Sequence, residues 1–306
     1  MRNAFAEEHT ALSRQDPRLV LLSGDIGNRL FDKFKAQCPD RFFNCGVAEA
    51  NMIGVAAGLA HGGMRPVAYT IAPFITTRVL EQIRVDVCYH ELPVVIVGVG
   101  AGLSYASLGS THHSCEDIAM LRVLPNMSVV CPGDPFEVRA ALRAAVNHPG
   151  PVYLRLGKKG EPAVHSQTPA FTIGKALVVR EGADVCLLST GTMLPVVVEA
   201  ATVLAGRGVS ARVVSFHTVK PLDEQMLADA FARFAVVATI EEHSLIGGFG
   251  GAVAEWMADR PPQRARLVRF GTPDVFFHEA GEQDYARERF GLTATEISRR
   301  VQEVFS

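Results

Sequence analysis

No two of the six cysteines in this 306-residue sequence are spaced as CxxC, and long apolar runs are also missing. Cys131 and Cys186 lie inside short apolar segments, which indicates small buried thiols and not a disulfide framework or a zinc site. The amphipathic N-terminal stretch has no apolar signal core, and no run of about 18 apolar residues occurs anywhere. We therefore expect a cytoplasmic protein that has no membrane partner.

Clusters of basic residues are absent as well. The chain has 30 Lys and Arg residues against 32 Asp and Glu residues, a net charge of −2, and no Lys/Arg run stands out. A nucleic acid is therefore not expected as a partner. A hydrophobic content of 48% and a charged content of 20% are typical of a globular protein with a substantial core. The length suits two domains of about 150 residues each.

The glycine-rich strings lack the spacing of a dinucleotide-binding motif. Neither GVGAG (98–102) nor GGFGG (247–251) reads GxGxxG with an acid about twenty residues later. GGFGG instead predicts a helix that begins close to a neighbouring backbone. His112, His113 and Cys115 could be read as metal ligands, but adjacent histidines rarely face one ion and no HxxxH spacing supports the set. We predict no metal ligands in this chain.

The first half of the sequence alternates short apolar runs with helical segments. Uniformly apolar runs are typical of parallel strands that helices cover on both faces, and they occur at 19–24, 41–46, 66–71, 92–99, 127–132 and 151–156. After the fifth run, Asp134, Pro135 and Glu137 supply an N-cap, a first helical residue and an acid three residues after the cap. Residues 1–157 are therefore predicted to form one α/β domain.

Residues 158–175 are rich in Gly, Pro and polar side chains, so we predict a linker there. A second α/β pattern follows in residues 176–306, with apolar runs at 183–190, 210–216, 234–242 and 264–271. Helices are predicted near 193–206, near 223–233 and from about 248, and Thr293 with Glu296 caps a closing helix. The predicted fold is thus α/β, with two domains that each contain a mostly parallel sheet flanked by helices.

Glu49 is the residue that most suggests chemistry. It is the only ionisable side chain between Arg41 and His61, and it opens a helix whose other residues are nearly all small or apolar. Such a helix is typically buried, and a buried carboxylate needs a dedicated partner or loses its charge. The alternative is an acid that only offsets the helix dipole.

The sequence around Glu49 resembles the pyrimidine-binding domain of transketolases in the string GVAEANMIGVAAGLAHGGMRPVAYTIAPF (46–74). Other parts follow in the family's order: SGDIGN, LGSTHHSCEDIAMLRVLPNMSVV and IEEHSLIGGFGGAVAE. The resemblance covers essentially the whole chain and implies a pyrimidine-binding domain followed by a transketolase C-terminal domain. It also implies that Glu49 is the glutamate that activates thiamine diphosphate. A carboxylate bound to the aminopyrimidine favours its imino form, which can take the proton of the thiazolium carbon.

The resemblance implies further residues around the cofactor. Tyr69 and Phe74 fit the aromatic position that packs on the pyrimidine ring, and we favour Phe74; both could instead be core aromatics. Asp25 follows the first apolar run, at the end of a strand where open sheets bind ligands. The alternative role for Asp25 is that of a turn residue before Gly27.

In the loop at 108–117, the resemblance places Thr111 and His112 in the substrate channel, where His112 can bind hydroxyls or move a proton. His113 is a further substrate-binding candidate. Lys158 stands where relatives have a phosphate-binding arginine, and a lysine acts there as a point charge. Leu108 replaces an Asp that reads a sugar hydroxyl in common transketolases, which puts the standard donor range in question.

The sequence lacks the GDG…N segment with which these enzymes hold the diphosphate through Mg²⁺. We therefore expect a separate N-terminal subunit to supply that domain and most Mg²⁺ ligands, in a two-plus-two heterotetramer. The expected function is transfer of a two-carbon ketol unit from a ketose or ketose phosphate to an aldose, and the chain alone should bind the cofactor poorly. The alternatives are the beta subunit of a 2-oxo acid dehydrogenase's decarboxylating component, a deoxyxylulose phosphate synthase, and a non-catalytic interaction subunit.

Overall fold

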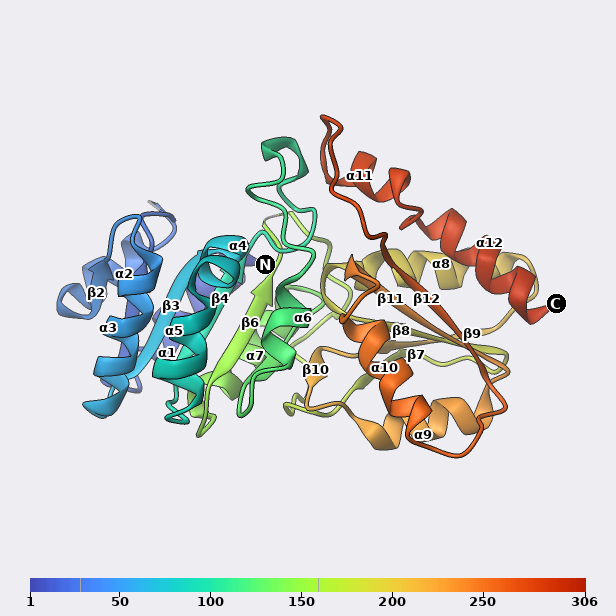
Figure 1. Ribbon diagram of the computed structural model, residues 1–306, viewed down its shortest axis with the longest axis horizontal. Helices are drawn as coiled ribbons and strands as arrows, with labels where there is room; N and C mark the ends of the chain where they lie inside the picture. The colour runs from blue at the N-terminus through green and yellow to red at the C-terminus, as the bar shows by residue number, and fades with distance from the viewer. Residues whose placement is uncertain (28, 159) are drawn as a thin grey trace.

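Two α/β lobes lie side by side in the computed structural model, which describes residues 1–27, 29–158 and 160–306 (Figure 1). The sheet of the first lobe has the order β10-β5-β6-β4-β3-β1-β2. Its first six strands in the chain all run parallel, and β10 runs antiparallel to β5. The strands are β1 (Leu19–Ser23), β2 (Phe42–Asn44), β3 (Arg65–Ile71), β4 (Val95–Val99), β5 (Ser128–Val130), β6 (Val152–Leu156) and β10 (Thr218–Lys220).

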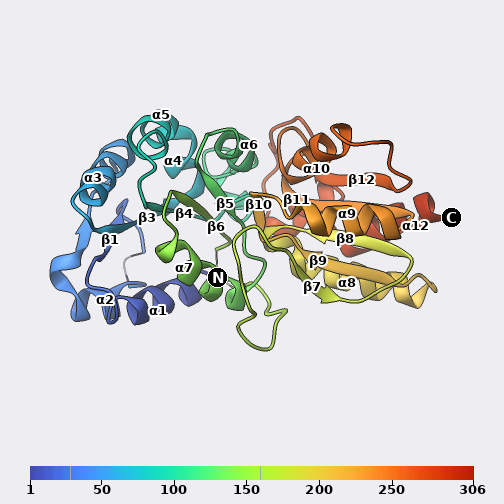
Figure 2. The ribbon, with the colours of Figure 1, turned by 90° about the horizontal axis from the view of Figure 1, so that it is seen from below.

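Helices cover both faces of this sheet, which explains why its central strands are apolar throughout. Every residue of β1, β4 and β6 is buried. One face carries α1 (Arg2–Leu12), α2 (Asp32–Gln37) and α7 (Pro135–Asn147) (Figure 2). The other face carries α3 (Glu49–His61), α4 (Ala72–Ile75), α5 (Leu80–Gln82) and α6 (Asp117–Arg122), together with the short segments η2 (Thr77–Val79) and η3 (Ile83–Cys88).

The second lobe is built on a five-stranded sheet of order β12-β11-β8-β9-β7. Four of its strands are parallel, and β7 is an antiparallel edge strand. The strands are β7 (Leu177–Arg180), β8 (Val185–Ser189), β9 (Ala211–Ser215), β11 (Val236–Ser244) and β12 (Arg266–Thr272). The helices are α8 (Leu194–Gly206), α9 (Glu224–Arg233), α10 (Phe249–Ala258), α11 (Gln283–Arg289) and α12 (Ala294–Phe305). The predicted fold class is therefore confirmed.

The lobes share more than a linker. β10 belongs to the second half of the chain but pairs with β5 at the edge of the first sheet. One apolar cluster continues across this junction, from Val129 and Cys131 of the first lobe to Phe216 and Val219 of the second. The first sheet is thus completed by the second half of the chain, so the two halves are expected to fold and move together.

Local signals in the sequence account for several element boundaries. Asp134 caps α7, because its side chain accepts the backbone N–H of Glu137 at 2.8 Å. Thr293 caps α12 in the same way. The described residues of the predicted linker form neither helix nor strand, and Lys159 within it lies outside the described residues, as does Asn28. Four elements, α1, β7, β10 and α11, were not predicted from the sequence.

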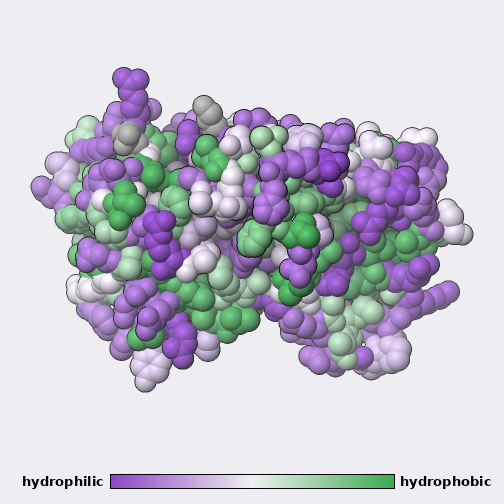
Figure 3. Space-filling view, turned by 45° about the horizontal axis from the view of Figure 1, so that its top comes forward, coloured by the Kyte–Doolittle hydropathy of each residue, from purple (hydrophilic) through white to green (hydrophobic). Residues whose placement is uncertain are grey.

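Apolar side chains on the surface form small islands among polar ones over both lobes (Figure 3). Several apolar side chains on and beside α3 and η3 are exposed: Val47 is 74% exposed, Tyr89 is 80% exposed, and Val55 and Val85 are also exposed. The prediction that α3 is buried all round therefore holds only for the face that packs on the sheet. Within the described residues, no helix is both long and apolar enough to cross a membrane.

Candidate active site

The carboxyl ends of the parallel strands meet along one edge of the first sheet, where open α/β sheets bind ligands. Asp25 follows β1, Phe74 follows β3, His112 lies in the loop after β4, and Lys158 follows β6. Glu49 begins α3 beside the end of β1, because a Cβ on Gly24 would lie 3.6 Å from Glu49 Oε1. The topology therefore brings most of the predicted site residues to a single edge of the sheet.

Glu49 forms the centre of a compact cluster of three side chains. Only 1% of the Glu49 side chain is exposed, and its Oε2 accepts a hydrogen bond from Arg78 Nη1 at 2.9 Å. The Arg78 guanidinium also lies over the Phe74 ring, with Cζ 4.4 Å from the ring centroid. Arg78 thus contacts both a buried carboxylate and an aromatic ring at the sheet edge.

Arg78 is the site residue that was missed at the level of the sequence. The buried Glu49 was expected to need a partner, and that role was assigned to a cofactor alone. Arg78 comes four residues after Phe74, a spacing that brings two side chains together on helical segments such as α4 and η2. A basic residue at that spacing was the available signal, because a buried acid and a nearby arginine are natural partners.

Asp25 lies at the rim of the same cluster, in the left-handed backbone region with φ of 57°. Asp and Asn tolerate this conformation better than most residues. Asp25 Oδ1 accepts a hydrogen bond from Asn44 Nδ2 at 2.9 Å, so the ends of β1 and β2 are tied together. Thr70, which faces Gly24, is buried with no hydrogen-bond partner for its hydroxyl among the described residues. The site therefore contains one polar atom that the chain itself leaves unsatisfied.

His112 borders the cluster through Phe74. Its ring is edge-on to Phe74 with centroids 5.2 Å apart, and edge-on to Tyr105 with centroids 6.1 Å apart. Thr111 Oγ1 lies 3.0 Å from His112 Nδ1. Burial, and secondly the neighbouring His113, lowers the pKa of His112 below its ordinary value. His112 is therefore mainly neutral at pH 7 and can both donate and accept a hydrogen bond.

His113 and Lys158 lie at the junction of the two lobes. The His113 ring is buried and packs against Phe277 of the second lobe, with centroids 6.0 Å apart. Lys158 Nζ lies 5.6 Å from the Tyr105 ring centroid and 3.4 Å from a carboxylate oxygen of Glu282, which precedes α11. Tyr105 thus connects Lys158 to the loop that carries His112.

Tyr69 does not join the cluster. Its side chain is only 1% exposed and stacks on Phe5 of α1, with ring centroids 5.3 Å apart and planes 15° apart. Phe31 packs edge-on against it at 5.0 Å, and burial raises the pKa of its hydroxyl. The Tyr69 ring belongs to the core on the face covered by α1, away from Glu49 on α3. This position corrects the cofactor-binding expectation for Tyr69, and we retain only Phe74 as the aromatic candidate.

A groove of about 500 Å³ leads to the cluster. Phe74 and Arg78 line it from the turn after β3, and Thr111 and His113 line it from the loop after β4. Phe276 of the second lobe contributes to the same groove and is 65% exposed. Both lobes therefore form walls of the approach to Glu49.

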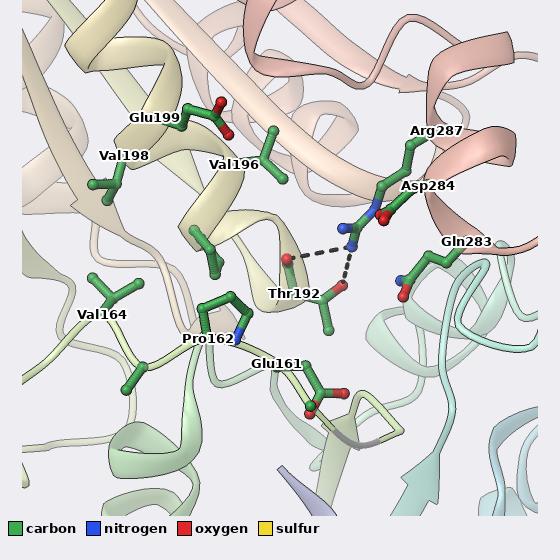
Figure 4. Close-up of a pocket in the computed structure, with 13 residues that line it drawn as sticks. Glu161, Pro162, Val164, Thr192, Val196, Val198, Glu199, Gln283, Asp284 and Arg287 are labelled. Atoms are coloured by element: carbon green, nitrogen blue, oxygen red, sulfur yellow. Dashed lines mark hydrogen bonds between the residues drawn. The ribbon is translucent and has the colours of Figure 1, made fainter.

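A second cavity, of about 650 Å³, lies between the linker and the second lobe (Figure 4). Arg287 of α11 points toward Thr192 there and donates to its carbonyl and hydroxyl oxygens. Glu161 and Glu199 add carboxylates to the lining. Arg287 is the one base among the described lining residues, and Glu242 already binds it. The described part of this cavity therefore offers no free cation for an anionic substrate, and we do not assign it to catalysis.

A separate buried charge network joins the two lobes. Asp117 Oδ2 accepts hydrogen bonds from Tyr153 Oη at 2.6 Å and from Arg155 Nε at 2.8 Å. Arg155 also donates to the backbone oxygens of Ser114 and Glu242 at 2.9 and 3.0 Å. Burial raises the pKa of Asp117, but Arg155, His243 and the hydrogen bonds from Arg155 and Tyr153 together outweigh this effect, and the pKa falls below its ordinary value. Asp117 Oδ2 thus carries the network, whereas Asp117 Oδ1 is buried without a hydrogen-bond partner among the described residues.

Two neighbouring acids on β11 complete the junction. Glu242 accepts hydrogen bonds from Leu103 N at 2.7 Å and from Arg287. Glu241 accepts two backbone N–H groups at the start of α10, at 2.6 and 2.7 Å, and burial raises the pKa of Glu241 to about 7. A Cβ on Gly248 would lie 2.2 Å from Glu241 Oε2, so GGFGG lets α10 begin against β11, as predicted. The atom nearest to Gly248 belongs to the Glu241 side chain, whereas the sequence predicted a neighbouring backbone.

Comparison with known proteins gives two family matches. Residues 1–161 match the family described as "Transketolase, pyrimidine binding domain". Residues 174–297 match the family described as "Transketolase, C-terminal domain". Together these matches span both lobes and include every candidate residue of the groove.

Three relatives resemble the chain over nearly its whole length. The 6-deoxy-6-sulfo-D-fructose transketolase subunit SqwH of a Clostridium species is 40% identical, over 99% of this chain and 94% of the relative. An apulose-4-phosphate transketolase subunit of Phocaeicola vulgatus is 35% identical, over 97% of this chain and 96% of the relative. A solved structure described as "Split gene transketolase, inactive beta4 tetramer" is 38% identical with a TM-score of 0.91, over 99% of this chain and 97% of that one.

Proposed function

The chain belongs to the transketolase family, and we propose that it works as the C-terminal subunit of a split, thiamine diphosphate-dependent transketolase. The proposed reaction moves a two-carbon ketol unit from a ketose donor to an aldose acceptor. The observation that carries the proposal is the buried Glu49 carboxylate beside the Phe74 ring, at the ligand-binding edge of the sheet.

The residues around Glu49 fit the aminopyrimidine ring of thiamine diphosphate. The Arg78 guanidinium, a planar group with an N–C–N edge, stacks on Phe74 and donates to Glu49. An aminopyrimidine is also flat, and one of its ring nitrogens can bind a carboxyl group through a shared proton, so Glu49 and the Phe74 ring can hold it at the same position. The unsatisfied Thr70 hydroxyl and the Asp25 carboxylate lie at the end of the same strands and add polar groups to this slot.

When bound, thiamine diphosphate supplies the carbon nucleophile that takes up and releases the ketol unit. We propose that Glu49 hydrogen-bonds the aminopyrimidine and exchanges a proton with it. The burial of Glu49 strengthens this hydrogen bond, because little water competes for the carboxylate. We propose that His112, neutral at pH 7, binds substrate hydroxyls or moves a proton, and that His113 contacts substrate from the wall of the groove.

The donor is proposed to carry an anionic group. The names of two relatives refer to a sulfo sugar and a sugar phosphate, which share this property. Lys158 is the candidate cation, because it follows β6 at the same edge of the sheet and is held only loosely by Glu282 at 3.4 Å. Leu108 lies four residues before His112 and is 54% exposed. Its apolar side chain cannot accept a hydrogen bond from the substrate hydroxyl that an Asp binds in common transketolases.

A separate N-terminal subunit is proposed to hold the diphosphate and Mg²⁺. Among the described residues, no group of three or more His, Cys, Asp or Glu side chains is arranged to hold a metal ion. The apolar side chains of Val47, two residues before Glu49, and of Val55 on α3 are exposed and suit burial by such a subunit, in a two-plus-two assembly. A split-gene relative is described as an inactive beta4 tetramer, and we propose that this chain is likewise inactive without its partner.

The location of the protein is proposed from its thiols. All six cysteines are free, and four of them are buried. Because free thiols persist in reducing compartments, we propose that the protein works in the cytoplasm.

The proposal is tested by co-expressing the chain with a transketolase N-terminal subunit from the same organism. Transfer from hydroxypyruvate or a ketose phosphate to an aldose is measured with and without thiamine diphosphate and Mg²⁺. We expect transfer only when both chains and the cofactor are present, and each chain alone is the control. Cofactor-dependent decarboxylation of a 2-oxo acid without ketol transfer would instead place the chain with the 2-oxo acid dehydrogenases.

A further inference from the structure

Glu49 has a hydrogen-bond partner within the chain, Arg78. Arg78 donates to its carboxylate at 2.9 Å and stacks on Phe74 at 4.4 Å, so one side chain makes both contacts that the proposed function assigns to the aminopyrimidine. We propose that Arg78 occupies the aminopyrimidine position in the cofactor-free chain and is displaced when thiamine diphosphate binds. This inference rests on the proposed function.

The shape of the guanidinium suits this role. It is planar, it presents N–H groups along an N–C–N edge, and it packs face-on against aromatic rings. A lysine ammonium can supply the charge but neither the flat face nor the fork. The pair of contacts at Glu49 and Phe74 is therefore specific for a flat, hydrogen-bonding group, which is the description of an aminopyrimidine as well.

The exposure of the two partners indicates which of them can move. The Glu49 side chain is 1% exposed, whereas the Arg78 side chain is 47% exposed. Arg78 can therefore turn toward solvent by changing side-chain torsions while α3 stays in place. The same groove contains the Glu116 carboxylate, which offers the displaced guanidinium an acidic neighbour.

A side chain that pairs with Glu49 until the cofactor binds, which we call a placeholder, stabilises the chain. A buried carboxylate without a partner is strongly unfavourable, and the slot beside Phe74 would otherwise tend to close or to lose the charge of Glu49. A chain that is made separately from the subunit holding the diphosphate must exist for some time without cofactor. Arg78 keeps the carboxylate paired and the aromatic face covered during that time.

The competition predicts that removal of Arg78 tightens cofactor binding. Breaking one cation–π contact and one half-exposed ion pair corresponds to roughly 5–30-fold in affinity. The dissociation constant of thiamine diphosphate is measured by calorimetric titration on the assembled two-chain protein with Mg²⁺. We expect it to fall by that factor in Arg78→Met and less in Arg78→Lys, which keeps the charge but cannot stack. Arg300→Met, on the exposed side of α12, is the matched control, because it removes a similar contact with the Phe270 ring, and it should bind like wild type.

A second measurement tests whether free guanidinium ion can take the position of the missing Arg78 side chain. In Arg78→Ala, guanidinium chloride at low millimolar concentration should weaken cofactor binding toward the wild-type value, whereas sodium chloride at the same ionic strength should not. Unchanged binding in Arg78→Met, or no effect of guanidinium, would overturn the placeholder role. Weaker binding in Arg78→Met would overturn it too, since Arg78 would then be a ligand of the bound cofactor. Absence of binding in wild type and variants alike would overturn the proposed function together with this inference.

Discussion

Glu49 and Asp117 are both buried carboxylates that bind an arginine, yet their surroundings differ in one decisive respect. Asp117 and Arg155 are 0% and 3% exposed, and Tyr153 adds a third buried group. Glu49 is equally buried, but its partner Arg78 is 47% exposed. The first acid is enclosed by groups that cannot leave, so it belongs to the structure. The second has a partner that can turn away, so it remains available to a ligand.

The comparison predicts the largest stability effect at Asp117. Asp117→Asn leaves the Arg155 guanidinium buried at the lobe junction without a counter-charge. We expect the free energy of unfolding to fall by about 3–5 kcal/mol. Denaturant unfolding of the purified chain measures the change, and Asp259→Asn on the exposed end of α10 is the matched control. A loss below about 1 kcal/mol would show that Asp117 is not a structural anchor.

A third buried acid, Glu241, adds a test based on how the free energy of unfolding depends on pH. Its pKa is about 7 in the folded chain, against an ordinary value of 4.5, so the folded state holds the proton more tightly between these values. The contribution of Glu241 to the free energy of unfolding is therefore fully present below about pH 4.5 and is lost as the pH rises through 7. Glu241→Gln should gain about 1–3 kcal/mol relative to wild type between pH 5 and pH 8.

Wild-type stability alone cannot test Glu241, because the neighbouring His243 also changes the free energy of unfolding with pH. Burial lowers the pKa of His243 to about 4, which gives wild-type stability an opposite slope between about pH 4 and 6.5. His243 Nδ1 lies 3.8 Å from Glu241 Oε2, so the two groups titrate together, and the comparison of wild type with Glu241→Gln is repeated with His243→Gln in both proteins to isolate the acid. Parallel pH profiles of the two proteins in denaturant unfolding would show that Glu241 is not protonated near neutral pH.

The smallest stability effect is expected at Glu49. Glu49→Gln removes a buried charge, while the half-exposed Arg78 regains its hydration, so the free energy of unfolding of the chain should change by less than about 1 kcal/mol. The measurement is the same denaturant titration as for Asp117→Asn. A loss comparable to that of Asp117→Asn would mean that the Glu49–Arg78 pair is structural and would remove the contrast between the two acids.

The sequence predicts the layers of strands and helices better than the contacts that join the two lobes. Runs such as 19–24 and 151–156 are apolar throughout because helices cover both faces of β1 and β6, and that pattern is local. The cap of α7 by Asp134 is equally local. β10 could not be predicted in this way, because three residues of the second half become a strand only by pairing with β5.

The candidate site shows the same division. Glu49 was predicted because one acid in an apolar helix is visible in the sequence, and the structure buries it as expected. The choice between Tyr69 and Phe74 was not decided by the sequence, since it depends on which face of the sheet each ring meets. Arg78 was missed for a related reason: its contact with Glu49 joins positions 29 residues apart in the chain.

The most direct test of the account is the ketol transfer rate of the assembled protein with Glu49→Gln. The account predicts a loss of roughly 10²–10⁴-fold, the range for removal of a positioned acid/base, with folding and assembly unchanged. Glu303→Gln on the surface of α12 is the matched control and should keep the wild-type rate. An unchanged rate in Glu49→Gln would contradict the account and make this chain a scaffold for catalysis carried out elsewhere.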